Sequence, residues 1–590
     1  MDEKLIVANC SGFYGDRFSA AREMVEGGPI DVLTGDYLAE LTMAILFRKT
    51  LKNPEAGYAT SFFHQMKEVM APCLSRGIKV VTNAGGLSPR GLADALAELA
   101  GGLGLSPKIA WIEGDNLFMD LETLQEKGES LRHLETGASP DDDPSPTMVT
   151  ANAYLGGWGI TRALVEGADI VVGGRIADAA LVSGPAAWRF GWKETDWDKL
   201  AGAVAAGHII ECGAQATGGN YPFMDEVGDY HHIGFPIAEI YPDGSSVITK
   251  HPGTGGSVSV GTVTAQLMYE IKGPEYLTPD VIARFDTISL SQEDADRVRV
   301  TGIRGQAPTD TLKVCCNRVD GHRNIIRFVL TGLDVDKKAE IVESTFFGVL
   351  GGKNQFDEVD VRLHGRALDD PQRLEDAHTI FEIAVRGQNA ALISKRFPQV
   401  AIELALASIP GFTLAELPGK GNPVIQHWPT LVSKLHVQTV VRMDDGRSIP
   451  IDWPDVSEAF PQTGVPVTDQ TEPVYSGDNT VFASLGTIMG ARSGDKGGDA
   501  NVGVWVKQAA AYEFLNHFLT VDQFRELLPD TASYAIERYD FPNLLAVNFY
   551  IHGILGDGVA SSLQSDPQAK SLGEYLRCKK VEIPAALLTE

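Results

Sequence analysis

The sequence predicts an α/β protein with three parts: an N-terminal parallel, doubly wound sheet, an α+β middle region and a C-terminal ferredoxin-like α/β sandwich. Three observations lead to this prediction. A strand–turn–helix pattern repeats five times in the first third of the chain. A stretch rich in Pro, Thr, Gln and Asp lies late in the chain, and the segment after it interleaves strands with helices. Short apolar strands that alternate with longer helices are typical of a parallel sheet covered on both faces, and interleaving of the second kind fits a ferredoxin-like unit.

The strands of the five repeats are followed by similar polar residues. Apolar runs at 5–8, 30–33, 78–81, 108–112 and 169–172 are each followed by small residues, glycine and Asn, Asp, Glu or Arg. In open α/β sheets ligands bind at the carboxyl ends of the strands. We therefore predict a shared crevice formed by Asn9, Ser11, Asp16, Asp36, Asn83, Gly85, Gly86, Glu113, Asp115, Arg175 and Asp178. The competing interpretation is that several of them are helix N-caps, where Ser, Asp and Asn are preferred.

A glycine-rich segment at 251–257 follows a strand-like run and precedes an alternating one. Successive backbone amides in such a turn can form a nest for phosphate or carboxylate, so Gly253, Thr254 and Gly255 are substrate-binding candidates. His251 is a candidate acid or base, since the unperturbed histidine pKa lies near neutrality. A wide hairpin loop is the alternative interpretation.

The densest polar stretch is 491–501, which follows the apolar run 481–489 and precedes the apolar run 502–506. We interpret it as a loop between two strands whose polar groups form half of a site. Asp495 and Lys496 are its catalytic candidates, together with Asp36 and Glu113 from the N-terminal region; Arg492, Ser493 and Asn501 are binding candidates. This interpretation requires the C-terminal unit to fold back onto the strand-end crevice. The alternative is a solvated turn.

Four segments are predicted: a Rossmann-like α/β domain at 1–275, an α+β domain at 276–455, a linker at 456–479 and the ferredoxin-like domain at 480–590. The chain length of 590 residues suits several domains. Dinucleotide-binding and P-loop fingerprints are absent, which counts against NAD- and ATP-dependent chemistry.

Composition restricts the partners. The net charge of −28 disfavours nucleic acid and anionic membrane surfaces, and no window approaches the about 18 apolar residues that suggest a membrane span. The N-terminus lacks the features of a secretory signal, and the six cysteines show no CxxC spacing. We expect a cytoplasmic protein that acts on a small molecule and forms a homo-oligomer. Mg²⁺ stays open as a cofactor, because hard cations prefer oxygen ligands, but the sequence specifies no metal ligands.

The motifs at 9–16, 33–40, 82–86, 173–178 and 251–256 resemble those of the acyclic terpene utilisation family, and 491–501 resembles that family's C-terminal ferredoxin-fold domain. The resemblance covers nearly the whole chain. It implies a role in the degradation of acyclic terpenes through CoA thioesters, but it brings no catalytic residues with it.

Two functions from different classes are favoured over a third, a nucleotide-using oxidoreductase or transferase, which the missing fingerprints disfavour. The first is a hydratase, dehydratase or carbon–carbon lyase acting on a branched acyl-CoA or related carboxylic acid, with Asp36 or Glu113 as base, Arg175 on a carboxylate and Lys496 stabilising an enolate or oxyanion. The second is a non-catalytic subunit or scaffold for neighbouring acyl-CoA enzymes. The sequence does not decide whether the protein is an enzyme.

Overall fold

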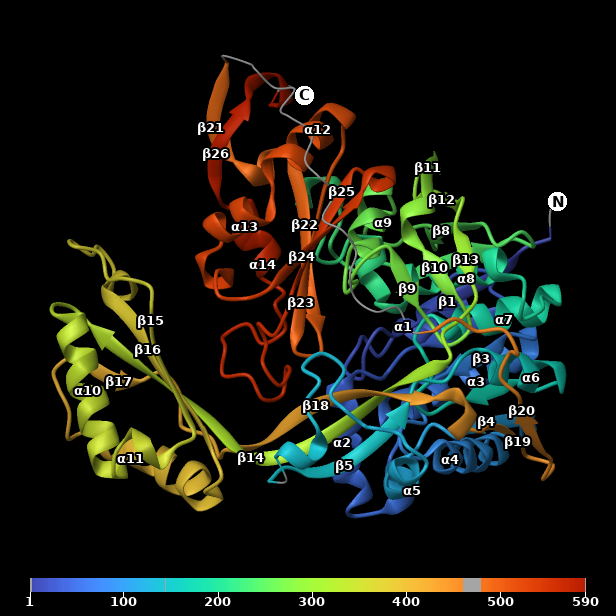
Figure 1. Ribbon diagram of the computed structural model, residues 1–590, viewed down its shortest axis with the longest axis horizontal. Helices are drawn as coiled ribbons and strands as arrows, with labels where there is room; N and C mark the ends of the chain where they lie inside the picture. Colours follow the sequence, from blue (N-terminus) through green and yellow to red (C-terminus); the bar gives the residue numbers. More distant parts are fainter. Residues whose placement is uncertain (1–2, 144, 460–478, 589–590) are drawn as a thin grey trace.

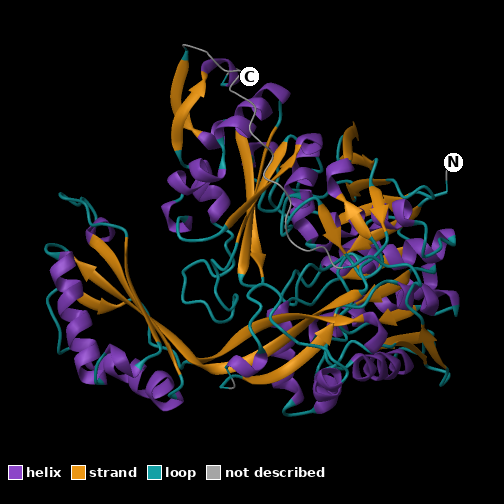
Figure 2. Cartoon of the chain, viewed as in Figure 1, coloured by secondary structure: helices purple, strands orange, loops and turns teal. Residues whose placement is uncertain are grey.

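The computed structural model describes residues 3–143, 145–459 and 479–588 (Figure 1). The predicted linker at 456–479 lies almost wholly outside these residues. Helices and strands are mixed throughout the described chain (Figure 2), which confirms the α/β class.

The N-terminal body is organised around an eleven-stranded mixed sheet. All five predicted strands are present at its centre and pair in parallel, in the order β1 (Leu5–Asn9), β2 (Val32–Gly35), β3 (Lys79–Thr82), β6 (Ile170–Val172) and β4 (Ile109–Glu113). Antiparallel strands extend both edges: β7 (Pro236–Ile240), β8 (Ser246–Lys250), β12 (Arg297–Thr301) and β11 (Ser289–Asp294) beyond β1, and β19 (Thr439–Met443) and β20 (Ser448–Ile451) beyond β4. The sheet is therefore parallel only at its centre.

Helices cover both faces of this sheet. Successive side chains of each strand point to opposite faces, so each strand contributes to two hydrophobic cores. Ala8 and Leu33 belong to one hydrophobic core, and Val7 and Val32 belong to the other. The first core is closed by α1 (Ala20–Glu26), α3 (Thr60–Arg76) and α4 (Pro89–Gly102); the second by α6 (Trp158–Val165), α7 (Ala180–Phe190) and α8 (Trp197–Glu211). The remaining helices of the body are α2 (Glu40–Thr50), α5 (Leu121–Glu126) and α9 (Val260–Leu267).

A long strand, β14 (Thr311–Thr331), links the body to an arm (Figure 1, left). Its first half pairs with β5 (Thr147–Ala153) and β18 (Asn422–Ser433). Its second half forms the arm with β16 (His378–Gly387), β15 (Glu358–His364) and β17 (Phe412–Leu414), covered by α10 (Val335–Leu350) and α11 (Phe397–Glu403) around a phenylalanine-rich core. A small sheet of β13 (Arg304–Gln306), β10 (Ile282–Arg284) and β9 (Glu275–Leu277) packs near α8.

Strands on both sides of the predicted boundary at residue 275 join the same large sheet, because β12 pairs with β8. Strands near 440 also join it, through the pairing of β19 with β4. The four predicted segments stay predictions. The body contains residues from the first two of them, 1–275 and 276–455.

The C-terminal domain is a four-stranded antiparallel sheet in the order β22 (Met489–Lys496), β23 (Asp499–Val506), β25 (Ala546–Ile551) and β24 (Ile536–Phe541). One face packs on α12 (Ala509–Phe518), α13 (Val521–Leu527) and α14 (Leu572–Arg577). The other face carries Trp505, Tyr539 and Tyr550, which belong to the hydrophobic core of the body. A strand pair, β21 (Thr480–Ser484) with β26 (Lys580–Pro584), lies beside it. The domain is therefore folded back onto the body.

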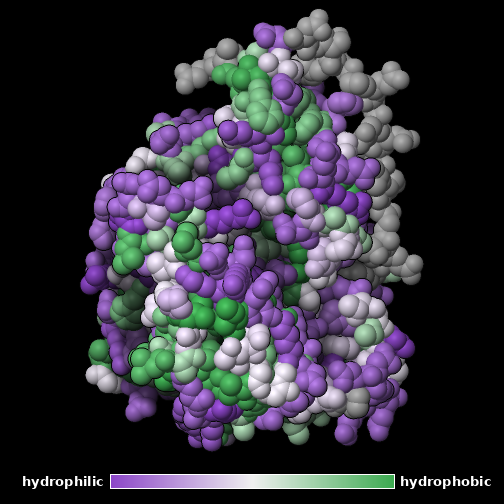
Figure 3. All heavy atoms as spheres, turned by 90° about the vertical axis from the view of Figure 1, so that its left-hand side faces the viewer, coloured by the Kyte–Doolittle hydropathy of each residue, from purple (hydrophilic) through white to green (hydrophobic). Residues whose placement is uncertain are grey.

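Viewed from the side of the arm, the surface is mostly hydrophilic, with apolar residues gathered low on this face (Figure 3). Across the described ranges, none of the helices is both long and apolar enough to span a membrane.

Candidate functional site

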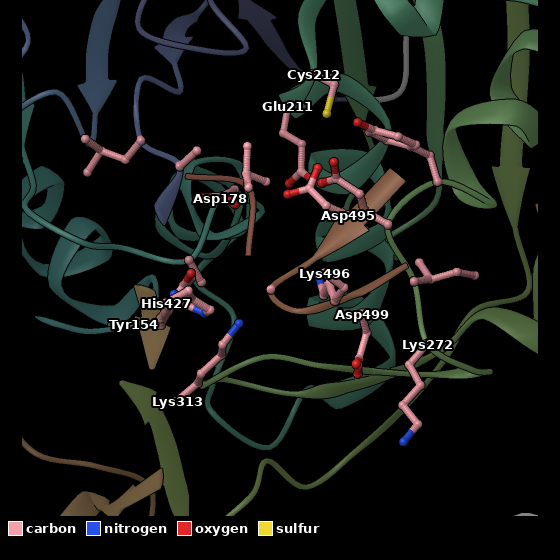
Figure 4. Close-up of a pocket in the computed structure, with 18 of the residues that line it drawn as sticks. Tyr154, Asp178, Glu211, Cys212, Lys272, Lys313, His427, Asp495, Lys496 and Asp499 are labelled. Atoms are coloured by element: carbon pink, nitrogen blue, oxygen red, sulfur yellow. The ribbon is translucent and has the colours of Figure 1, made fainter. Parts of the chain in front are cut away.

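A cavity of about 1660 Å³ lies at the seam between the body and the C-terminal domain. Protein pockets for drug-sized ligands measure about 300–1,000 Å³, so this cavity has room for a larger molecule. Its walls come from the region after β2, the end of α8, the strands β14 and β18, and the tip of the β22–β23 hairpin (Figure 4).

Six residues singled out from the sequence line this cavity together. Asp16, Asp36, Arg175 and Asp178 come from the body, and Asp495 and Lys496 come from the C-terminal hairpin. The structure thus brings the C-terminal half of the expected site to the N-terminal crevice.

Asp36 is held in place by buried hydrogen bonds. Its Oδ1 accepts from Asn83 Nδ2 at 2.6 Å and from the Leu38 amide at 3.1 Å. Asn83 Oδ1 in turn accepts from the Tyr37 amide at 2.9 Å. Burial, and then the charge of Asp178, raise the pKa of Asp36 well above its usual range, although Arg175 opposes the shift. Asp36 therefore binds its proton more tightly than an exposed aspartate does.

Arg175 is buried, and hydrogen bonds and a ring contact orient its guanidinium group. Its Nη1 donates to Leu38 O and Asp178 Oδ1, both at 2.9 Å, and its Nη2 donates to the Tyr154 hydroxyl at 2.9 Å. The guanidinium also stacks over the Tyr154 ring at 4.2 Å from the centroid. Arg175 therefore orients Asp178 and Tyr154, which both line the cavity.

A second layer fixes these groups. Asp115 Oδ2 accepts from the Arg175 amide at 2.9 Å and from Asn152 Nδ2 at 2.8 Å, and burial raises the Asp115 pKa. Asn9 Nδ2 donates to Ile210 O at 2.7 Å and to Glu211 O at 3.0 Å, which anchors the end of α8.

Glu211 forms the acidic end of the cavity with Asp495. Figure 4 shows their carboxylates side by side, below the Cys212 sulfur. Burial, followed by the charges of Asp178 and Glu270, raises the pKa of Glu211 well above its usual range, and Lys496 opposes this shift. Burial, followed by the charges of Glu270 and Glu211, also raises the pKa of the Cys212 thiol. Glu211 and Cys212 therefore both bind their protons more tightly than exposed groups of their kind.

The stretch 491–501 is a tight hairpin and not a long loop, which corrects the expectation from sequence. β22 and β23 stay paired up to Lys496 and Asp499, so the turn consists only of Gly497 and Gly498. Gly497 has φ +68°, and a Cβ on Gly498 would lie 2.2 Å from Gly556 O. Two glycines allow the strands to continue to the tip, so the polar residues become strand residues. The expected strand at 481–489 is also broken, by a 3₁₀ turn at Leu485–Thr487 between β21 and β22.

Arg492, Ser493 and Asn501 lie at contacts within and between the domains and not in the cavity wall. Arg492 Nη1 donates to Asn220 O at 3.3 Å, and Ser493 Oγ accepts from the Gly573 amide at 2.9 Å. Asn501 Nδ2 donates to Met268 O at 2.8 Å, which joins the domain to the body.

The other candidates do not line the cavity. Glu113 is half exposed on β4, where it accepts from Arg442 Nε at 2.8 Å and from Trp111 Nε1 at 2.7 Å. His251 is buried with Nε2 at 2.9 Å from Met24 O. The remaining candidates make local structural contacts: Ser11 with Phe13 O, Gly85 with Gly173 O, Gly86 with Asn83 O, Thr254 with His251 O and Lys250, Gly255 with His232 O, and Gly253 at φ +77°.

Several cavity residues were missed from the sequence: Tyr154, Glu211, Glu270, Lys313 and His427. A signal existed for Glu211, because it ends α8, a helix whose preceding residues are almost all apolar and buried. Lys313 lies on β14, His427 lies on β18, Tyr154 follows β5 and Glu270 follows α9, and none of them stands in a concentrated polar motif.

The described residues contain no group of three or more His, Cys, Asp or Glu side chains that could hold a metal ion. The structure therefore assigns no ligands to Mg²⁺.

Comparison with known proteins gives one consistent result. Residues 5–443 match the family model described as acyclic terpene utilisation family protein AtuA, and residues 483–582 match the AtuA ferredoxin-like domain. No curated protein and no solved structure matches. Because the first model spans most of the chain, the chain belongs to the acyclic terpene utilisation family, with its ferredoxin-like domain at the C-terminus.

Proposed function

We propose that this protein is a catabolic enzyme of the hydratase, dehydratase or carbon–carbon lyase type. Its substrate is a branched acyl-CoA thioester, or a related carboxylic acid, from the degradation of acyclic terpenes or similar compounds. Its family supports the catabolic setting. We also propose that it works in the cytoplasm as a homo-oligomer.

One observation carries the proposal: two carboxyl groups with raised pKa values, Asp36 and Glu211, share a cavity with Asp178, Asp495 and Lys496. The proposed reactions all add or remove a proton next to a carbonyl group, or pass through an enolate. Carboxyl groups whose environments favour different protonation states supply the acid and the base. A cation beside them stabilises the developing oxyanion, and we assign that role to Lys496.

The opposite end of the cavity suits the anionic part of such a substrate. In Figure 4, Lys313 and Lys272 lie below Lys496, on the side away from the carboxylates of Glu211 and Asp495. Lys313 and Lys272 are two of the cations that line the cavity. They fit the phosphates of a CoA thioester, which bind ammonium groups as point charges.

The test is proton exchange at the α-carbon of isovaleryl-CoA in D₂O, followed by NMR. This reaction reports acid–base chemistry at the carbonyl before the complete substrate is known. We expect exchange by the wild type and a loss of at least about 100-fold in Lys496→Ala, the size typical for removal of an oxyanion-stabilising group. Lys337→Ala, an exposed position on the arm, is the matched control.

Absence of exchange across a panel of branched acyl-CoA esters, together with an absence of binding, would refute the enzymatic proposal. The scaffold alternative would then be tested by co-purification with a partner acyl-CoA enzyme whose full activity requires this protein.

A further inference from the structure

β14 and β18 form the floor of the cavity, and a buried cysteine outside the acid–base group lies on the cavity side of β14. Lys313 and Asn317 of β14 line the cavity, whereas Val314 and Cys316 belong to the hydrophobic core beneath. Side chains alternate along a strand, so Cys315 lies on the cavity side of β14. This separates the vicinal cysteines into one on the core side and one on the cavity side.

Cys315 lies beside an imidazole from the neighbouring strand. Its Sγ is 3.6 Å from His427 Nδ1, within hydrogen-bonding distance for sulfur. His427 lines the cavity, and β14 and β18 pair here in register, with Asn317 opposite His427. An imidazole placed in this way is the base that activates the thiol of many cysteine nucleophiles.

The C-terminal hairpin packs over this pair. A Cβ added to Gly497 would lie 3.1 Å from His427 Cδ2, so the turn rests on the imidazole edge. The His427 amide also donates to Asp557 O at 2.9 Å, in the second glycine-rich turn of the C-terminal domain. His427 is therefore held by both domains, and Gly497, the residue after Lys496 in the hairpin turn, lies against its ring.

The neighbouring thiols have different surroundings. Cys212 also lines the cavity, but burial and the charges of Glu270 and Glu211 raise its pKa. Burial likewise raises the pKa of Cys316. Anionic or apolar surroundings suppress the thiolate, while an adjacent imidazole or lysine favours it. Cys315 has His427 beside it and Lys313 two residues before it on the same face.

We propose that Cys315 and His427 form a nucleophilic pair that accepts the acyl group of a thioester and holds it as an acyl-cysteine. This inference rests on the thioester class proposed above. His427 Nδ1 takes the thiol proton as Cys315 Sγ bonds to the thioester carbonyl carbon. The bond from that carbon to the leaving sulfur breaks, and His427 returns the proton to the leaving thiolate.

The step exchanges one thioester for another, so it requires no oxidant or reductant. Cys315 is 1% exposed and His427 is 7% exposed, which shields an acyl-cysteine from water. The thioester reaches the thiol when the hairpin turn at Gly497 lifts from His427.

The direct experiment incubates the protein with isovaleryl-CoA, stops the reaction in acid and measures intact mass and peptide masses. We expect one isovaleryl group on Cys315. The adduct should be absent in Cys315→Ala and form at least about tenfold more slowly in His427→Gln. Cys578→Ser, an exposed position outside the cavity, should behave as the wild type. Cys315→Ser provides a second variant of nearly unchanged size, and thermal melting checks the fold of each.

An acyl group on another cysteine would overturn the inference. The absence of an adduct while isovaleryl-CoA raises the melting temperature would also overturn it, and would leave the proposed acid–base function intact.

A second measurement needs no thioester. Iodoacetamide should alkylate Cys315 at least about tenfold faster than Cys212, and this preference should disappear in His427→Gln. Equal rates at the two thiols, or a rate at Cys315 that is insensitive to His427→Gln, would contradict the nucleophilic pair whatever the substrate is.

Discussion

The side-chain oxygen of Asn501 accepts a hydrogen bond from the backbone amide of Glu270 at 2.8 Å. Asn501 belongs to β23 of the C-terminal domain, and Glu270 lines the cavity from the body. The Asn501 amide group also donates to Met268 O at 2.8 Å and to Asn548 Oδ1 at 2.9 Å. One fully buried side chain therefore holds the two domains in register at the cavity.

Asn501→Ala should loosen this seam. It leaves the Glu270 amide and the Met268 carbonyl without their partner, and each unsatisfied buried polar group costs about 1–3 kcal/mol. We expect faster hydrogen exchange in β22 and β23 and a lower melting temperature. Asn354→Ala, at an exposed position of the arm, is the control. Unchanged exchange in both strands would show that Asn501 does not hold the domain in place.

Asp36→Asn should flatten the pH dependence of stability. The folded-state pKa of Asp36 is raised, chiefly by burial, so the folded protein binds the proton more tightly than the unfolded chain. That stabilisation is complete below the unfolded pKa of about 3.9 and is lost as pH rises through the folded pKa. Asparagine keeps the oxygen that accepts from Asn83 and Leu38 and carries no charge.

The measurement is the free energy of unfolding of both proteins between pH 4 and pH 8. The stability of the wild type should fall relative to Asp36→Asn as the pH rises. Asp94→Asn, at an exposed ion pair on α4, should leave the profile unchanged. A difference between wild type and Asp36→Asn that is constant with pH would contradict the raised pKa.

His552 connects two carboxylates of the C-terminal domain. Its Nε2 lies 2.6 Å from Glu537 Oε1, and its Nδ1 lies 3.5 Å from Asp499 Oδ2. The Asp499 hydrogen bond is the main cause of the raised His552 pKa. The stabilisation is therefore present below the unfolded pKa of about 6.5 and is lost as the pH rises through the higher folded pKa.

His552→Gln should remove this loss of stability above pH 6.5. Melting of the C-terminal domain between pH 5.5 and pH 9 measures it, with His64→Gln, an exposed histidine of α3, as the control. Identical pH profiles for wild type and His552→Gln would refute the role of the two carboxylates.

Gly498→Ala should displace the hairpin tip. The added methyl group would collide with Gly556 O at 2.2 Å, and the backbone that carries Asp495 and Lys496 must move. A displacement of about 1 Å of a catalytic group can slow turnover about 100-fold, so α-proton exchange should fall with little change in overall fold. Gly101→Ala on α4, where a Cβ meets nothing within 4 Å, should retain full exchange.

The repeating strand–helix units were predictable because both signals are local. Leu5, Val32, Val80, Ile109 and Ile170 lie in short apolar runs bounded by glycine and polar residues, and all five runs became neighbouring parallel strands. The antiparallel extensions were not predictable, since β19 pairs with β4 across more than 300 residues. Such pairing depends on tertiary contacts that leave no local pattern.

The site was only partly predictable for the same reason. Asp36, Arg175 and Lys496 stand in dense polar motifs, and they line the cavity. Glu113 stands in an equally suggestive strand end, but β19 places Arg442 beside it and engages its carboxylate. Lys313 and His427 lie in ordinary strands, and only the pairing of β14 with β18 brings them to the cavity.

The central claim is that both domains complete one ligand site. Isothermal titration of isovaleryl-CoA into the wild type, Lys313→Ala and Lys496→Ala tests it most directly, because these lysines come from the body and from the C-terminal hairpin. We predict that each substitution raises Kd about tenfold, or about 1.4 kcal/mol. A Kd that is unchanged in Lys496→Ala would contradict a site shared across the seam.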